Sequence, residues 1–196
     1  YEMQRGLVGS EMCIRDRYNG LIKTMRRLCS EKHSRNEVEL TWRKLTQMFV
    51  LVATNSGLRV GEQKQLRWKD VQIEMHKDKE GKTVKLARII VRAATSKVRK
   101  GRTLLCRNGQ YFERIEELFG KRSAEDLVFS MDGKRIINLK TLNKYFRAML
   151  RAAEIRDVVG RGIVLYSLRH FMITQRIMAG LGLSLIHISE PTRPLY

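Results

Sequence analysis

The chain has 196 residues, 43% of them hydrophobic, and a formal net charge of +19. That length supports one domain with a full core and excludes a second complete domain. The charge favours a polyanionic partner, nucleic acid first and an anionic membrane surface second, over a basic protein without such a partner. Cys29 and Cys106 show neither metal-ligand spacing nor a disulfide framework, which favours an intracellular location. No native stretch reads as a membrane span or an export signal.

The two ends of the chain are related to each other at the DNA level. Residues 183–193, LSLIHISEPTR, can be encoded by a DNA stretch whose complementary strand, read one base out of phase, translates as LVGSEMCIRD, the sequence of 7–16. Such a stretch resembles a transposase-type sequencing adaptor. We therefore expect 1–17 to be adaptor-derived or unassigned, 183–196 to be adaptor-derived, and the gene product to be truncated on both sides. Each of these ends has zero net charge, so the native part, 18–182, carries the whole excess.

The native part begins with helical patterns. Residues 18–33 form a basic amphipathic segment, and we interpret 18–36 as a linker helix or as the end of a lost N-terminal DNA-binding domain. A second helix follows and carries a nearly continuous apolar run up to Ala53, which is typical of a buried helix.

The stretch 55–63, NSGLRVGEQ, ends this helix at a glycine. Arg59 is therefore expected at the end of a rigid element, with Glu62 one turn away on a short following helix. The pattern is typical of an active-site corner. A helix C-cap followed by a surface arginine is the alternative.

Alternating apolar residues then predict a small antiparallel sheet. Its strands are expected at 71–75, 84–91 and 102–106, joined by turns at 77–82 and 96–101. The second turn is rich in lysine and arginine.

Helical periodicity returns in the last third of the native part. Helices are expected at 111–119 and 139–155, with a short extended segment at 126–130 between them. A glycine-containing loop at 156–163 leads to the sequence VLYSLRH at 164–170, which runs into a final helix. The sequence therefore predicts an α+β fold that is mainly α-helical and contains one three-stranded antiparallel sheet.

Three boxes in this order resemble the catalytic domain of the tyrosine recombinases, the phage integrase family. They are GLR at 57–59 followed by Glu62, a lysine in a basic β-turn, and YSLRH at 166–170. The resemblance covers most of 40–182. It implies a tyrosine-recombinase catalytic-domain fold, here a partial, C-terminally truncated domain over 37–182.

The chemistry of the family explains the cations. Breaking a phosphodiester without a metal needs preorganised positive charge around the non-bridging oxygens, and an arginine fork can hold two phosphate oxygens at once. The resemblance implies that Arg59 and Arg169 clamp the scissile phosphate and that a turn lysine protonates the leaving 5′-oxygen. Lys97 matches that lysine by register and Lys100 is its competitor; both could instead simply attract phosphate. We expect Arg59, Lys97 and Arg169 to converge on one concave basic face.

Further residues are expected to support the two arginines or to contact DNA. Tyr166 occupies the position where the family most often has histidine, and we expect it to hydrogen-bond the phosphate, because a phenol is a poorer base than an imidazole. A core tyrosine is the alternative. Glu62 and His170 are expected to support the site, Glu62 by bonding backbone or orienting a basic neighbour, with a plain surface carboxylate as its alternative. Further DNA-binding candidates are Arg99, Lys100 and Arg102.

The resemblance implies site-specific DNA recombination or integration through a 3′-phosphotyrosyl intermediate, without metal, ATP or other cofactor. The family's nucleophilic tyrosine and the His or Trp box before it lie downstream of Arg169, beyond the native part. His187 and Tyr196 only mimic them, so we expect this fragment to lack the nucleophile and to be inactive.

Two alternatives to a recombinase stay open, namely a non-catalytic basic DNA-binding protein or decayed recombinase, and a type IB topoisomerase. The implied partner is double-stranded DNA, bound by a homotetramer on paired sites, with no membrane involved. The implied location is the cytoplasm of a prokaryotic or phage-infected host cell, in association with the nucleoid.

Overall fold

The computed structural model describes residues 2–77, 80–96, 99–155 and 163–180. The chain divides into two compact units, Tyr1–Gln47 with Leu139–Val164 and Met48–Asn138 with Leu165–Tyr196. Within the described ranges, no helix has both the length and the apolar character that a bilayer crossing requires. The segment boundaries expected after residues 17, 36 and 182 stay predictions.

Helices and strands follow one another in the predicted order. The helices are α1 (Glu2–Leu28), α2 (Glu37–Ser56), α3 (Val60–Gln63), α4 (Gln110–Phe119), α5 (Leu139–Ala152) and α6 (Ser167–Met178). The strands are β1 (Val71–Lys77), β2 (Thr83–Val91) and β3 (Arg102–Arg107), and they form an antiparallel sheet in the order β1-β2-β3. The predicted mainly helical α+β fold with a three-stranded antiparallel sheet is confirmed.

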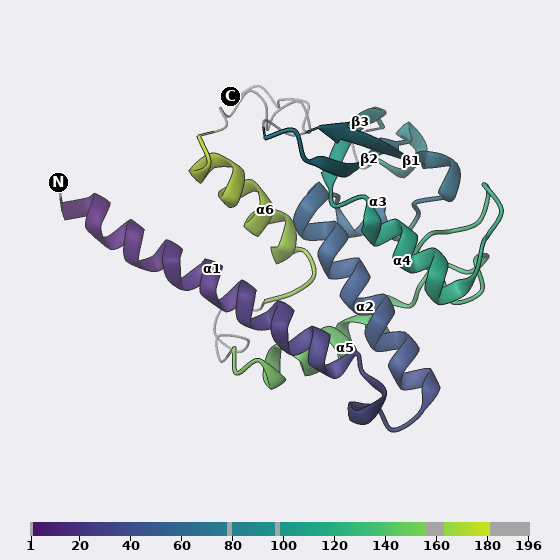
Figure 1. Cartoon of the computed structure of the whole chain (residues 1–196), viewed down its shortest axis with the longest axis horizontal. Coiled ribbons are helices and arrows are strands. Elements are labelled where there is room, and N and C mark those ends of the chain that lie inside the picture. Colours follow the sequence, from purple (N-terminus) through teal and green to yellow (C-terminus); the bar gives the residue numbers. More distant parts are fainter. Residues whose placement is uncertain (1, 78–79, 97–98, 156–162, 181–196) are drawn as a thin grey trace. The chain divides into compact units, whose positions relative to one another are not determined.

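In the first unit, α1 and α5 lie side by side (Figure 1). The apolar face expected for 18–33 is buried at Leu21 and Met25. The Trp42 ring of α2 stacks on the Tyr145 ring of α5, with centroids 5.9 Å apart and planes 9° from parallel. The amphipathic faces that the sequence predicts thus give this unit its core.

In the second unit, one face of the sheet is buried. Ala87 and Ile89 are fully buried in β2 and Val91 is 2% exposed, whereas Ile90, between Ile89 and Val91, is 38% exposed. This alternation follows from the two-residue repeat of a β-strand. The end of α2 is buried through Phe49, whose ring meets Phe129 edge-on with centroids 5.0 Å apart. The corner that follows α2 is therefore anchored on a rigid element.

Two later segments complete this unit. The segment 126–130, expected to be extended, makes an isolated antiparallel bridge between Leu127 and Arg67 and does not join the sheet. Helix α6 begins at Ser167, so the second arginine box lies in its first turn. Most of the loop expected at 156–163 lies outside the described residues.

Candidate active site

The corner after α2 depends on Gly57. This residue has φ +68°, a left-handed conformation that residues with a Cβ atom rarely adopt, and its N–H closes the last turn of α2 by donating to the carbonyl of Ala53 at 2.9 Å. A Cβ atom built on Gly57 would lie 1.6 Å from the Cε atom of Met172 in α6. The glycine therefore both reverses the chain direction and permits the close approach of α6.

Arg59 follows this reversal and caps α3. The Arg59 backbone N–H donates to the Oε2 atom of Glu62 at 3.0 Å, and its guanidinium Nη1 lies 3.3 Å from the Oε1 atom. The Glu62 side chain is only 2% exposed, and the Arg59 side chain is 18% exposed. Glu62 is thus an interior carboxylate bonded to Arg59, not a plain surface carboxylate.

Glu62 has a second arginine partner from the sheet. Arg102, the first residue of β3, donates from Nη1 to Oε1 at 2.9 Å and from Nη2 to Oε2 at 2.7 Å, and its side chain is 9% exposed. Burial alone raises the pKa of Glu62, but the bonds from Arg102 and from the Arg59 backbone outweigh it and hold this pKa below its ordinary value. The carboxylate stays ionised between two guanidinium groups.

The turn before Arg102 carries the expected general acid. Lys97, expected in that role, lies outside the described residues. Its competitor Lys100 is exposed, as is Arg99, which has φ +50° and donates its backbone N–H to the Ser96 carbonyl at 3.0 Å. Because the Arg102 fork is occupied by Glu62, of the three basic candidates only Arg99 and Lys100 have exposed side chains suited to contact DNA.

The second arginine box meets the first. Arg169 is 2% exposed, and its Nη1 atom donates to the carbonyl oxygen of Gly57, two residues before Arg59. Tyr166 is 47% exposed, which excludes a buried core position, and its ring meets the His170 ring edge-on with centroids 5.0 Å apart. The structure therefore brings the box at 166–170 against the glycine of the box at 57–59.

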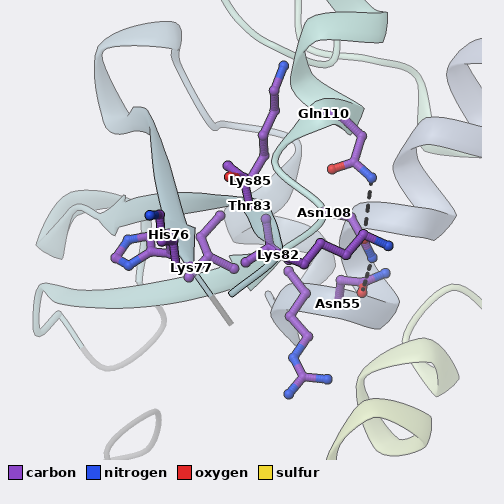
Figure 2. Close-up of a pocket in the computed structure, with 11 residues that line it drawn as sticks. Asn55, His76, Lys77, Lys82, Thr83, Lys85, Asn108 and Gln110 are labelled. Carbon is purple, nitrogen blue, oxygen red and sulfur yellow. Dashed lines mark hydrogen bonds between the residues drawn. The ribbon is translucent and has the colours of Figure 1, made fainter. Parts of the chain in front are cut away.

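A concave region lies at the far end of the sheet, and sequence reasoning missed it. It is a cavity of about 1000 Å³ (Figure 2), lined by Asn55, His76, Lys77, Lys82, Thr83, Val84, Lys85, Leu86, Arg107, Asn108 and Gln110. The lysines of the turn expected at 77–82 were its only sequence signal. Among the described residues, no group of three or more His, Cys, Asp or Glu side chains is arranged to hold a metal ion.

The chain matches the Phage integrase family over residues 23–187 and belongs to that family. This range starts inside the segment 18–36 and runs past residue 182, where the native part is expected to end. The resemblance inferred from the three sequence boxes is thereby confirmed. A search of curated proteins found no significant match.

Solved tyrosine recombinases share the fold. A crystal structure of the XerH site-specific recombinase bound to difH substrate, in a pre-cleavage complex, has a TM-score of 0.63 at 16% identity, over 87% of this chain and 44% of that chain. A FLP recombinase–Holliday junction complex has a TM-score of 0.53 at 12% identity, over 93% of this chain and 44% of that chain. The Tn1549 transposon integrase in complex with circular intermediate DNA has a TM-score of 0.50 at 12% identity, over 82% of this chain and 53% of that chain. The chain thus spans about half the length of these structures.

Proposed function

We propose that this chain is part of a tyrosine recombinase that performs site-specific DNA recombination or integration. One observation carries the proposal: the guanidinium group of Arg169 bonds the carbonyl of Gly57, so both arginine boxes belong to one site. Family membership and the shared fold of DNA-bound recombinases support the same reaction class.

In the proposed reaction, a tyrosine oxygen attacks the scissile phosphorus and the bond to the 5′-oxygen breaks, leaving a 3′-phosphotyrosyl link. Arg59 and Arg169 hold the non-bridging oxygens as negative charge develops on them. Lys97, or Lys100 if the turn is displaced by a few residues, gives a proton to the leaving 5′-oxygen. Tyr166 hydrogen-bonds the phosphate. No metal or ATP takes part in these steps.

The remaining predicted residues act through the clamp in this proposal. Glu62 orients Arg59, since its carboxylate bonds both the backbone and the guanidinium group of that residue. His170 orients Tyr166 through the edge-on ring contact. Arg99 contacts the DNA backbone, whereas Arg102 is a positioning residue that holds Glu62.

We further propose that the nucleophilic tyrosine is missing from 18–182, so that this chain binds DNA without cleaving it. Tyr166 precedes Arg169 in its box, whereas the nucleophile of the family follows the second arginine. Duplex DNA is the proposed partner and a homotetramer on paired sites the proposed assembly. The proposed location is the cytoplasm of a prokaryotic or phage-infected host, in association with the nucleoid.

Trapping the covalent intermediate tests these proposals. A pool of duplexes with nicks near random central sequences would be incubated with this chain and with a chain extended by the downstream gene sequence. We expect a covalent protein–DNA adduct only with the extended chain, and we expect Arg59→Ala to abolish it. An adduct with the present chain that disappears with Tyr196→Phe would contradict the missing nucleophile. No adduct with the extended chain would favour a non-catalytic DNA-binding protein.

A further inference from the structure

The cavity at the end of the sheet is built from cationic and amide side chains (Figure 2). The amides form a chain: the Nδ2 atom of Asn108 donates to Oδ1 of Asn55 at 3.2 Å, and Nε2 of Gln110 donates to Oδ1 of Asn108 at 3.3 Å. Lys77 at the end of β1 and Arg107 at the end of β3 line the same cavity, and both side chains are exposed. We propose that this cavity is a second phosphate-binding site that holds the sugar–phosphate backbone of a nucleic-acid strand.

The charged side chains that line the cavity are all basic. None of its eleven lining residues is acidic. Lys85 donates to both oxygens of Glu113 at 2.7 Å, and the His76 ring lies 3.0 Å from Glu74. The proposal therefore rests on Lys77 and Arg107.

A further arginine, Arg176, adds positive charge next to the cavity. Arg176 of α6 lies 3.5 Å from the carbonyl oxygen of Asn55, a lining residue. Burial, and then the nearby positive charge of Arg107, lower the pKa of Arg176. Two guanidinium groups close enough to repel one another destabilise the free protein, and a bound anion would offset that repulsion.

The shape and lining of the cavity favour a phosphate backbone over other anions. A volume of about 1000 Å³ is far larger than a single phosphate group and has room for several. Among the described lining residues the only aromatic ring is the imidazole of His76, which lies 3.0 Å from Glu74, so contact through the backbone is favoured. Its aliphatic members are Val84 and Leu86, too few for the apolar centre that a protein partner normally requires.

This site is distinct from the Arg59 corner. In the pairing of β2 with β3, Arg102 lies opposite Val91 and Arg107 lies opposite Leu86. Five residue steps of a strand separate the two ends of β3, or roughly 17 Å. The proposed site therefore goes beyond the proposed recombinase reaction and does not depend on it.

Binding measurements on the whole chain test the proposal. Tripolyphosphate would be titrated by calorimetry, and a short random-sequence duplex by fluorescence anisotropy at several salt concentrations. The pocket variant is Lys77→Ala with Arg107→Ala. The control variant, Lys121→Ala with Arg151→Ala, removes the same charge from exposed positions outside the cavity.

We expect the pocket variant to bind tripolyphosphate at least about tenfold more weakly, because two charge-assisted contacts are lost. For the duplex, the slope of log K against log salt concentration should fall by about 1.8, close to 0.9 for each lost phosphate contact. The control variant should change both quantities clearly less. Equal losses in the two variants would overturn the proposal, since they would reflect net charge alone.

Two further experiments test whether the cavity binds an acidic protein segment instead, and whether the anion binds at the Arg59 corner. A polyglutamate peptide whose binding depends on Lys77 and Arg107 more strongly than duplex binding does would overturn the proposal in favour of an acidic protein segment. The pocket variant would also be combined with Arg59→Ala. Persistence of the tripolyphosphate effect in that background would support a separate site, and its disappearance would show that the anion binds at the clamp. A failed cleavage experiment leaves these measurements unaffected.

Discussion

Arg102→Met should destabilise the chain strongly, because it removes one partner of a buried ion pair. The Arg102 side chain is 9% exposed and that of Glu62 is 2% exposed, so solvent screens their interaction little. Removing one member of a buried pair typically costs about 3–5 kcal/mol, because the other charge stays buried without compensation. Arg59 still bonds Glu62 from its backbone and its guanidinium group, which places the expected loss near the low end, about 3 kcal/mol.

A double-mutant cycle measures this quantity. Urea unfolding followed by tryptophan fluorescence would be compared for Arg102→Met, Glu62→Gln and the double variant. The double variant should be less destabilised than the sum of the single variants, with a coupling of roughly 2–3 kcal/mol, because neither Arg102 nor Glu62 is then left as a buried charge without the other. An Arg102→Met loss under about 0.5 kcal/mol, or simple additivity, would refute the reasoning.

The sheet supplies a matched control for this cycle. Arg88 donates to both oxygens of Glu74, from Nε at 2.5 Å and from Nη2 at 3.1 Å, so this pair also has two bonds, although Arg102 uses Nη1 and Nη2. This pair is exposed, with side chains 43% and 28% accessible. Arg88→Met should therefore cost much less than Arg102→Met. Similar losses at the two positions would mean that burial does not decide the strength of the pair.

Three more predictions follow from single contacts. Because the folded-state pKa of Glu62 is lowered, its stabilisation is complete above its unfolded pKa and is lost as the pH falls through its folded pKa; acid unfolding of Glu62→Gln should show a shallower pH dependence. Gly57→Ala should cost at least about 1 kcal/mol in urea unfolding, from strain at positive φ and the clash with Met172, whereas Gly61→Ala, with open space around its Cβ position, should be nearly neutral. Burial raises the pKa of the Cys106 thiol to about 12, so iodoacetamide followed by peptide mass spectrometry should find Cys106 unmodified until the chain unfolds.

The corner after α2 and the three strands could be predicted from the sequence because the patterns that indicate them lie in adjacent residues. A glycine after an apolar helix predicts the turn, and period-two alternation with basic turns predicts the strands to within two residues at each end. These features depend on neighbours in the chain, which a single sequence displays directly.

The partners of the cations were not predictable in the same way. The sequence shows Arg99, Lys100 and Arg102 as three similar charges in one turn, and we expected all three to contact DNA. Which of them faces inward depends on the strand register and on Glu62, 40 residues earlier in the chain. The cavity likewise draws its lining from segments between residues 55 and 110. Such long-range pairings are set by packing, not by local pattern.

The two cationic sites of the second unit also differ in how their charge is balanced. At the corner, a buried carboxylate between Arg59 and Arg102 offsets their repulsion and holds their geometry in the free protein. Preorganised charge of this kind stabilises a transition state well, because little reorganisation is needed during the reaction. In the cavity, none of the described lining residues is acidic, and these residues include Lys77 and Arg107. A bound anion would offset the repulsion among these cations, which fits the phosphate-backbone site that we propose for the cavity, whereas the internal carboxylate fits the catalytic role that we propose for the corner.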